Sequence, residues 1–372
     1  MNYTELFKWF HVHPELGFEE TATTEKIKEI LFSQGIEILN TGLKTGLIAV
    51  VRGKYPGKSI CLRADIDALP IAEQTGLTYS STAANAMHAC GHDFHTTATI
   101  AAANILQLER DKLKGTVYFA FEPGEEVFGG AKALIDTGLL NGVSEFYGFH
   151  VSPSMGVGQI GIKAGGVMAA VDRFRIEVTG NGTHAATPHL GNNPIPILIS
   201  LISSLQTFSA SKLSPTSPHI IGFTEICGGT AWNIIPDTAF CEGTVRTLNE
   251  NDRDKIHTAF ERIISYHGNL TESDCRLNWQ SGAPCIENDG ELCALALDAA
   301  RKVGLETVSV IPEMISDDFS LLTKENNAKG LYIRIGSGIG YSLHHPQFSV
   351  NPSAIEPTAE FLTELIKLTL KG

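Results

Sequence analysis

The sequence predicts an α/β fold: a central, mostly parallel sheet flanked by helices and interrupted by a smaller ferredoxin-like α+β domain. Up to about residue 167, short apolar runs alternate with helical segments, which is the pattern of a parallel sheet. After Gly165-Gly166, polar and apolar residues alternate, which is typical of strands with one face in water. Strands resume near 307–311. We therefore expect a discontinuous larger domain at 1–167 plus 283–372, and an inserted domain at 168–282.

The individual elements follow from local patterns. Residues 1–34 predict two helices around His13-Pro14-Glu15-Leu16-Gly17, and Gly35 stands where the second helix would stop. In the larger domain, apolar runs predict strands at 47–51, 59–65, 116–121, 146–151, 307–311 and 331–335, and helices at 96–108, at 131–140 and from about 353. The inserted domain is predicted to run strand 172–178, helix 193–210, strands 219–227 and 238–246, helix 252–267 and strand 275–279, a ferredoxin-like order.

Composition excludes several classes of partner. The formal net charge of −13 argues against binding to nucleic acid or to an anionic membrane. Seven scattered cysteines in a chain of 372 residues indicate reduced thiols, so we expect a cytoplasmic protein. The first residues do not show the basic and apolar regions of a signal peptide. No uncharged apolar run reaches about 18 residues, so we expect no membrane span.

The stretch Met87–His95 is the densest group of potential metal ligands, with three histidines, a cysteine and an aspartate. Cys90 and His92 are separated by one glycine, so in an extended or tightly turned loop their side chains can converge. A thiolate and an imidazole suit zinc or manganese better than calcium or magnesium. The alternative is a turn that contains histidines by chance, because the pattern is short.

Further candidate ligands stand where predicted strands end. Side chains at the carboxyl ends of parallel strands line one crevice, so residues from separate strand ends can meet there. These residues are Asp65 and Asp67, Glu125 and Glu126, His150, and His344. Considered one at a time, His150 is more typical of a core histidine and His344 of a loop histidine. Asp65 and Asp67 could orient ligands or hold the loop.

The adjacent Glu125 and Glu126 predict a catalytic pair. Two carboxylates at one site need a neutralising cation. One can bind a metal while the other takes a proton from the attacking water. The alternative is a solvated acidic turn at the start of a helix, where glutamate also favours the helix dipole.

Three polar residues of the inserted domain are candidate substrate contacts. His184 lies in a glycine-rich turn and Asn233 follows Gly228-Gly229-Thr230-Ala231-Trp232. Either side chain could donate a hydrogen bond to a developing oxyanion. Arg246 ends a predicted strand and could bind a carboxylate. Composition alone favours the alternative of ordinary turn residues and a surface charge.

Several of these motifs together resemble the metal-dependent aminoacylase/carboxypeptidase family, in its amidohydrolase branch. That branch includes N-acyl-amino-acid amidohydrolases, hippurate hydrolases, indole-acetyl-amino-acid hydrolases and N-acetyl-diaminopimelate deacetylases. The matching segments span nearly the whole chain in order: His13–Gly17, Arg63–Pro70, Met87–Thr96, Pro123–Glu126, Gly148–His150, the His184 turn, Gly228–Pro236 without position 232, and Leu343–Pro346.

The resemblance implies a metal site with two divalent transition metal ions per chain, Mn or Zn, with Co or Ni also compatible. Cys90 would bind both ions, and His92, Glu126, His150 and His344 would complete their coordination. Glu125 would be the general base. His184, of the same chain or of a partner subunit, would stabilise the oxyanion, and Asn233 and Arg246 would contact the substrate. The inserted domain would be a lid and a dimerisation surface, which implies a homodimer or a tetramer.

Some residues depart from the family pattern. Glu122 and Gly124 stand where glutamine and alanine are usual, so Glu122 could raise the pKa of Glu125 and Gly124 could loosen the turn. Thr183, Trp232 and His345 also differ from the usual residues. None of these changes removes a ligand or the base, so they bear on substrate preference.

We therefore expect a metal-dependent amidohydrolase that cleaves N-acetyl, N-benzoyl or similar N-acyl amino acids by metal-activated water. The alternative enzyme is a dipeptidase or carboxypeptidase acting on short peptides. A catalytically inactive metal-binding relative would lack a ligand or the base, and none is missing from this sequence. A reduced environment would protect Cys90, which we expect to be an exposed thiolate whenever metal is absent.

Overall fold

The structure is a computed structural model that describes residues 1–371 as two compact units. The first unit contains residues 1–165, 287–311 and those from 317 onward. The second unit contains residues 166–286 and 312–316. Each unit has a hydrophobic core of its own.

The first unit is a mixed α/β layer. Its helices are α1 (Tyr3–Val12), α2 (Thr21–Ser33), α3 (His92–Leu108), η1 (Arg110–Lys112), η2 (Glu125–Val127), α4 (Gly130–Asp136), α7 (Gly290–Val303), α8 (Phe319–Glu325), η4 (Pro352–Ala354) and α9 (Ile355–Lys371). Its sheet contains β1 (Glu37–Ile38), β2 (Leu47–Arg52), β3 (Tyr55–Asp65), β4 (Lys114–Glu122), β5 (Glu145–Ser152), β6 (Gln159–Gly161), β15 (Glu306–Val308) and β16 (Lys329–Gly336). The short strands β7 (Gly165–Met168) and β14 (Ile286–Asn288) lie at the unit boundaries.

The sheet order is β1-β2-β4-β3-β5-β16-β6-β15, and its centre is parallel. β4, β3, β5 and β16 pair in parallel, whereas β1, β2 and β6 add antiparallel pairs. Asp65 pairs with Glu122, and His150 pairs with Arg334, so these strand ends lie at one edge of the sheet. The largely parallel sheet expected from the alternation of strands and helices is therefore confirmed.

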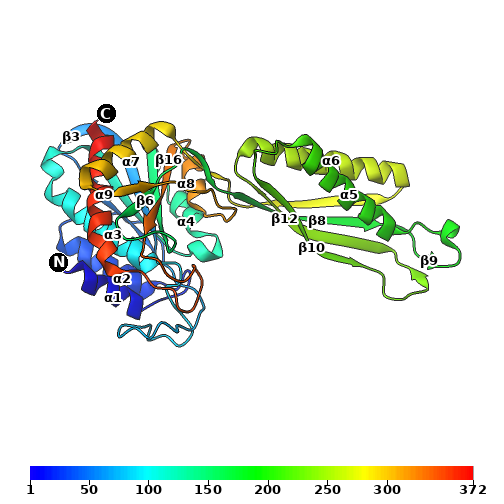
Figure 1. The fold of residues 1–372 in the computed structure, drawn as a ribbon, viewed down its shortest axis with the longest axis horizontal. Helices are drawn as coiled ribbons and strands as arrows, with labels where there is room; N and C mark the ends of the chain where they lie inside the picture. Colours follow the sequence, from blue (N-terminus) through cyan, green and yellow to red (C-terminus); the bar gives the residue numbers. More distant parts are fainter. Residues whose placement is uncertain (372) are drawn as a thin grey trace. The chain divides into compact units, whose positions relative to one another are not determined.

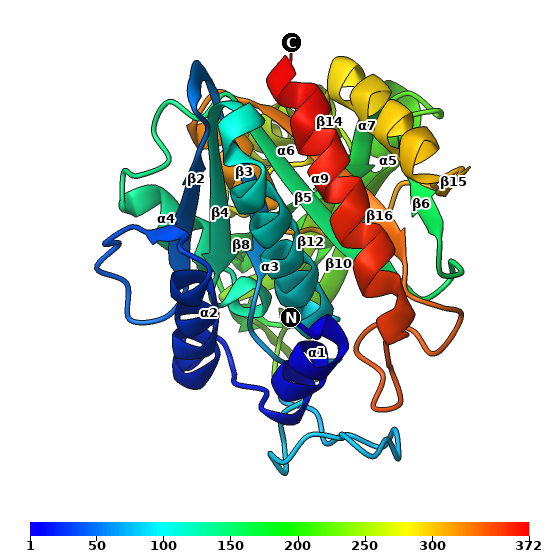
Figure 2. The ribbon, with the colours of Figure 1, turned by 90° about the vertical axis from the view of Figure 1, so that its left-hand side faces the viewer.

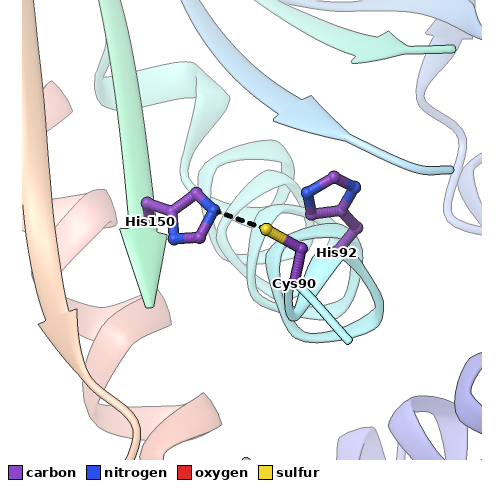
Figure 3. A group of neighbouring side chains, drawn as sticks. All are labelled: Cys90, His92 and His150. Atoms are coloured by element: carbon purple, nitrogen blue, oxygen red, sulfur yellow. Dashed lines mark hydrogen bonds between the residues drawn. The ribbon is translucent and has the colours of Figure 1, made fainter. Parts of the chain in front are cut away.

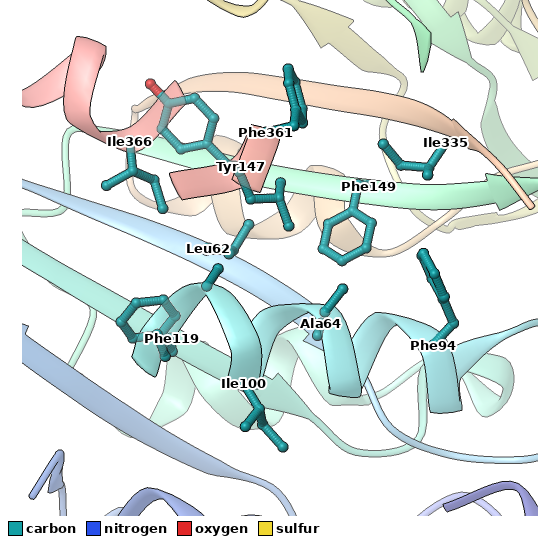
Figure 4. Packing of buried hydrophobic residues seen from close by; sticks show 14 of the residues in the cluster. Leu62, Ala64, Phe94, Ile100, Phe119, Tyr147, Phe149, Ile335, Phe361 and Ile366 are labelled. Carbon is teal, nitrogen blue, oxygen red and sulfur yellow. The ribbon is translucent and has the colours of Figure 1, made fainter. Parts of the chain in front are cut away.

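Helices cover both faces of this sheet. On one face, α3 and α9 lie side by side across β3, β4, β5 and β16 (Figure 2). Their side chains Phe94, Ile100 and Phe361 belong to the same buried hydrophobic cluster as Leu62 and Phe149 (Figure 4). On the other face, α4 packs on β4, and α8 packs on β5 and β16. Removal of these apolar side chains from water holds the strand ends rigidly in place.

The boundaries of several helices differ from those predicted. The helix expected at 96–108 begins at His92, because Gly91 adopts a left-handed φ of 86° and its carbonyl accepts the first hydrogen bonds of the helix. His92 is thus a helical residue and does not belong to an extended loop.

The helix predicted at 131–140 ends at Asp136, before Gly138 at φ 68°. α7 was not predicted, although Asp289 caps its start and Gly304 ends it in a left-handed conformation. α8, also unpredicted, has only seven residues.

The second unit has the strand and helix order of a ferredoxin-like layer. It consists of β8 (Ala170–Thr179), β9 (Thr183–His184), η3 (Pro188–Leu190), α5 (Pro194–Lys212), β10 (His219–Gly228), β11 (Ile234–Ile235), β12 (Thr238–Thr247), α6 (Glu250–Thr271) and β13 (Asp274–Ser281). The antiparallel sheet β10-β12-β8-β13 carries α5 and α6 along one face (Figure 1).

Length and composition would allow α5 to cross a membrane, a property found for no other helix within residues 1–371. The core helix of a water-exposed protein passes the same test, so this is weak evidence for a span. Leu198, Leu201 and Leu205 of this helix are buried in the core of the second unit.

Candidate metal centre

The five residues that were predicted as metal ligands meet at the carboxyl edge of the parallel strands. Potential ligand atoms of Cys90, His92 and His150 lie within 4.8 Å of one another. Those of Cys90, Glu126 and His344 form a second group within the same limit. Because Cys90 belongs to both groups, its sulfur stands where two neighbouring ions could share it.

His150 is oriented by its own backbone. Its Nδ1 donates to the carbonyl of Val151 at 2.9 Å, which leaves Nε2 as a lone-pair acceptor. That Nε2 lies 3.3 Å from Sγ of Cys90, as Figure 3 shows. His150 comes from β5 and Cys90 from the turn before α3, so two separate elements aim their ligand atoms at one point.

His92 has the geometry of a metal-binding histidine. Its Nδ1 donates to Oδ1 of Asp67 at 3.1 Å. Its Nε2 is buried and, among residues 1–371, has no hydrogen-bond partner. A carboxylate that holds one ring nitrogen fixes the tautomer and leaves the other nitrogen free for a metal. The other oxygen of Asp67 accepts the Glu126 N–H at 3.1 Å, so one carboxylate positions two of the predicted ligands.

Glu126 and His344 complete the second group. Oε1 of Glu126 is buried without a hydrogen bond among the described residues, and it lies 3.3 Å from Nε2 of His344. The His344 N–H donates to the carbonyl of Ala89 at 2.9 Å, which ties the C-terminal loop to the turn that carries Cys90. His344 has a left-handed φ of 63°, an uncommon conformation for a residue other than glycine.

The donor set fits divalent transition metal ions. It combines sulfur, imidazole and carboxylate, and it includes buried polar atoms that lack a hydrogen-bond partner within residues 1–371. Burial, Glu126 and Glu125 raise the pKa of the Cys90 thiol well above its ordinary value. A thiolate at this position therefore needs bound cations to stabilise it. The expectation of an exposed thiolate was wrong, because Cys90 is only 7% exposed.

Glu125 lies beside these groups in η2 and is buried. One of its oxygens is within 4.8 Å of ligand atoms of His92 and Glu126. Burial first, and then Asp317 and Asp318, raise the pKa of Glu125 well above its ordinary value, although Arg63 opposes the change. A carboxyl group with a raised pKa can both accept and return a proton near neutral pH.

Arg63 forms a buried ionic cluster under the site. Its guanidinium donates to Glu122 at 2.6 Å and to Asp65 at 2.7 Å. It also lies 3.2 Å from Asp317 and 3.3 Å from Asp318. Glu122 was expected to raise the pKa of Glu125, but Glu122 pairs with Arg63, and the leading causes of the raised pKa are burial, Asp317 and Asp318.

Asp65 supports the site through His95. Its Oδ1 accepts from Nδ1 of His95 at 2.6 Å, and Nε2 of His95 accepts the Val151 N–H at 3.0 Å. Both ring nitrogens of His95 are therefore occupied, although it lies in a group with His92 and Asp65. Asp65 and Asp67 hold different histidines by hydrogen bonds, His95 and His92 respectively, and Oδ2 of Asp65 also lies 3.7 Å from Nε2 of His92.

Sequence reasoning gave no role to Arg63, His95, Asp317 and Asp318. A positive charge inside an apolar strand was a signal for Arg63, since a buried arginine needs carboxylate partners. The adjacent Asp317-Asp318 before the apolar Phe319 was a weaker signal. His95 belonged to the histidine-rich stretch, but its pairing with Asp65 depends on the tertiary structure.

In the second unit, His184 and Asn233 are neighbours. β9 pairs with β11 through His184 and Ile234, and the Ala185 N–H donates to the carbonyl of Asn233 at 3.0 Å. Nδ1 of the exposed His184 accepts the Ala186 N–H at 3.0 Å, so the neutral ring carries its proton on Nε2. Nε2 is then a hydrogen-bond donor.

Arg246 lies away from His184 and Asn233 in the second unit. It lies near the far end of β12 from Thr238, opposite Val171, and donates to the carbonyl of Met314 at 3.0 Å. A strand rises about 3.3 Å per residue, so the eight residue steps of β12 from Thr238 to Arg246 span roughly 26 Å.

Comparison with known proteins identifies relatives of the whole chain. A family model described as Peptidase family M20/M25/M40 matches residues 61–368. An N-acetyl-L-cysteine deacetylase from Bacillus subtilis is 40% identical over 97% of this chain and 86% of the relative. Thermostable carboxypeptidase 1 from Saccharolobus solfataricus is 34% identical over 93% of this chain and 90% of the relative.

A solved structure supports the same relationship. A Bacillus subtilis protein described as a dinuclear metal binding peptidase from M20 family superposes with a TM-score of 0.88. It shares 36% sequence identity, and the match covers 99% of this chain and 98% of that chain.

Proposed function

The chain belongs to the peptidase family M20/M25/M40, and its relatives in this family are hydrolases of amide bonds. We propose that this protein is a metal-dependent amidohydrolase of N-acyl amino acids. The observation that carries this proposal is the pair of ligand groups that share Cys90, with Glu125 beside them. The relationship to the N-acetyl-L-cysteine deacetylase supports an acylated amino acid as the substrate.

Five side chains would hold two ions. His92 and His150 form one group with Cys90, and Glu126 and His344 form the other group with Cys90. The ligand set suits Zn or Mn, and Co or Ni are compatible with it. When bound, such ions polarise the substrate carbonyl and lower the pKa of a water molecule.

Glu125 would be the general base and then the general acid. Its carboxylate accepts a proton from the water whose oxygen bonds to the carbonyl carbon. The carbon–nitrogen bond then breaks, and Glu125 returns the proton to the nitrogen of the leaving amino acid. Burial excludes solvent from Glu125, and Asp317 and Asp318 keep its pKa raised. The transferred proton can therefore stay on Glu125 between the two steps.

The second unit would supply the substrate contacts. Nε2 of His184 carries the hydrogen that a negatively charged carbonyl oxygen requires. The side chain of Asn233 could bind the substrate beside it, because the pairing of β9 with β11 places the two residues together. Arg246 would recognise a carboxylate elsewhere on this unit.

We also propose a cytoplasmic homodimer. The seven cysteines are all free, as in a reducing compartment. β10 is an edge strand of the second unit, and it exposes Ile220 and Ile226 beside unpaired backbone groups. Exposed edges of this kind pair readily with a second copy. Light scattering of the purified protein would give its mass directly.

A carboxypeptidase or dipeptidase activity is the second candidate. The specific observation in its favour is the 34% identity to Thermostable carboxypeptidase 1. The same base and ligands would serve both reactions, so substrate contacts would distinguish them.

One experiment tests both candidates. The purified protein, supplied with Zn or Mn, is offered N-acetyl, N-benzoyl and N-indole-acetyl amino acids beside dipeptides. We expect the highest kcat/KM on an N-acyl amino acid and about two bound ions per chain. Glu125→Gln should keep the metal and lower kcat by about 100-fold or more. The exposed Glu360→Gln is the matched control. A protein that binds no metal after supplementation, or a fully active Glu125→Gln, would refute the proposal.

A further inference from the structure

The N-terminal segment Leu16–Glu20 packs against the turn that carries Glu125. The segment joins α1 to α2, and Leu16 forms a bridge with Ala68, next to Asp67. The turn, Pro123–Glu126, joins β4 to η2. The mechanism above uses the turn but assigns nothing to the segment, although more than 100 residues separate the two in sequence.

Glu20 makes the direct connection. Its side chain is fully buried, and its Oε1 accepts the Gly124 N–H at 2.7 Å. On the other side of Glu125, the Glu126 N–H donates to Oδ2 of Asp67 at 3.1 Å. Two carboxylates from different parts of the chain therefore hold the amides that flank Glu125. A turn held at both sides has little freedom to rotate its peptide planes.

Close packing reinforces the hydrogen bond. A Cβ atom at Gly17 would lie 2.8 Å from Cγ2 of Val127 and 3.2 Å from Cα of Gly124. A Cβ atom at Gly124 would lie 2.6 Å from the ring of Phe18. The expectation that Gly124 loosens the turn was therefore wrong, because Phe18 occupies the space that glycine leaves.

Backbone strain marks the same contact. Phe18 has a left-handed φ of 62°, which is costly for an aromatic residue. Gly124 has φ 61°, and glycine adopts this conformation freely. The strained Phe18 directs its ring onto Gly124, and Glu20 follows two residues later. Such strain persists only where the surrounding structure enforces it.

We propose that Leu16–Glu20 is a positioning element for the catalytic turn, and that Glu20 is the positioning residue that sets the orientation of Glu125 through the Gly124 amide. The proposal rests on the proposed function, in which Glu125 is the base. Without Glu20, the Gly124 N–H would be buried without an acceptor, and the peptide before Glu125 would rotate to find one. Misplacement of a catalytic group by about 1 Å can lower the rate by about 100-fold.

Glu15 provides a matched control within the same motif. Its carboxylate accepts the N–H groups of Ala22 and Thr23 at 3.0 and 2.8 Å, so it caps the start of α2. Within the described part of the chain, this carboxylate makes no hydrogen bond or ion pair with the turn. Glu15→Met should therefore lower the melting temperature through the helix cap but leave kcat near the wild-type value.

The test compares wild type, Glu20→Gln, Glu20→Met and Glu15→Met, each loaded with metal. Glu20→Met keeps the side-chain volume but removes the acceptor, so we expect kcat to fall at least about tenfold while KM stays within about threefold. Bound metal should remain at the wild-type level. Glu20→Gln keeps an acceptor oxygen and should recover kcat to within about threefold of wild type. Hydrogen exchange at the Gly124 amide should accelerate in Glu20→Met only.

Three outcomes would overturn the proposal. One is fast Gly124 exchange in Glu20→Met with an unchanged kcat, which would leave the proposed function intact. Another is an equal loss of kcat in Glu15→Met and Glu20→Met, which would indicate a general structural effect. If wild type binds metal and protects the Gly124 amide but hydrolyses no substrate, the proposed function fails and the positioning role falls with it.

Discussion

Oδ1 of Asp67 lies 3.1 Å from Nδ1 of His92, while Nε2 on the far side of the same ring has no hydrogen-bond partner among residues 1–371. This arrangement fixes the orientation of the imidazole and leaves Nε2 free to bind a metal ion. Because the second oxygen of Asp67 accepts the Glu126 N–H, the same carboxylate positions one predicted metal ligand in each of the two groups.

Replacing Asp67 by alanine should weaken metal binding. Nδ1 of His92 would lose the acceptor that orients the ring, and the Glu126 N–H would also lose its acceptor. We therefore expect a decrease of about 10- to 100-fold in metal affinity. Isothermal titration of the apoprotein with Zn or Mn measures this directly. The exposed Asp136→Ala is the control. An unchanged affinity in Asp67→Ala would show that the hydrogen bond to His92 is not needed.

Cys90→Ser should reduce the number of bound ions. Cys90 is common to both ligand groups, so its loss affects both positions, and a serine hydroxyl is a poor substitute for a thiolate. We expect fewer than two ions per chain by elemental analysis, and a kcat at least about 100-fold lower. Cys293→Ser, at a buried cysteine of α7, should keep both bound ions and the wild-type kcat. Full occupancy in Cys90→Ser would contradict a shared sulfur.

Arg63→Met should destabilise the first unit strongly. It would leave Glu122, Asp65 and their neighbours as buried carboxylates without a cation, which typically costs about 3–5 kcal/mol. Urea denaturation gives the free energy of unfolding. The exposed pair of Arg52 with Glu37 is a suitable comparison, since Arg52→Met should cost at most about 1 kcal/mol. Similar losses for both variants would argue against a special role for the buried cluster.

Stability should fall at alkaline pH because of His11. Burial lowers the pKa of His11, but Asp93 at 2.7 Å and Glu73 at 3.2 Å outweigh burial and raise it to about 10. The folded state therefore holds a proton that the unfolded chain loses near 6.5. This contribution to stability is complete below about pH 6.5 and is lost as pH rises toward 10, by up to about 1.4 kcal/mol per pH unit.

Urea denaturation between pH 6 and pH 9 tests the role of His11. The decrease in the free energy of unfolding should be smaller in His11→Gln, which cannot take up the proton. His13→Gln, at an exposed position of the same region, should retain the wild-type slope. A slope that is identical in wild type and His11→Gln would exclude His11 as the titrating group.

His184→Ala should slow turnover without removing metal. The variant lacks the Nε2 donor that the Ala186 N–H helps to orient, and the loss of one oxyanion donor typically lowers kcat by about 100- to 1,000-fold. Steady-state kinetics and elemental analysis separate the two effects. His189→Ala, an exposed histidine of the neighbouring η3, should behave as wild type. Loss of bound metal in His184→Ala would assign the residue to the metal site instead.

Much of the site could be predicted because its residues lie at recognisable strand ends. The apolar run of β3 ends at Asp65, β4 ends before Glu125, and β5 ends just after His150, so the parallel-sheet rule placed them at one edge. The start of α3 was placed four residues late, because the positive φ of Gly91 was not recognised as a helix start. α7 was missed even though Asp289 and Gly304 mark its two ends.

Other features depend on contacts between distant segments. Arg63 and Asp317 are 254 residues apart, and no local pattern relates them. Glu20 and Gly124 are 104 residues apart, and their contact requires the turn at Phe18. Neither relationship can be inferred from spacing, since loops of any composition could have brought other carboxylates to the same places.

Local patterns were sufficient for most of the long strands and helices, for the types of potential ligand and for the edge of the sheet at which they gather. Those properties follow from side-chain periodicity and from where apolar runs stop. Only the tertiary structure decided that Cys90 belongs to two groups of potential ligands, that Asp67 holds both His92 and Glu126, and that Glu20 accepts the Gly124 N–H beside Glu125. Hydrogen bonds and shared ligands depend on distances of a few ångströms between remote residues, and those distances arise when the packed core brings the segments together.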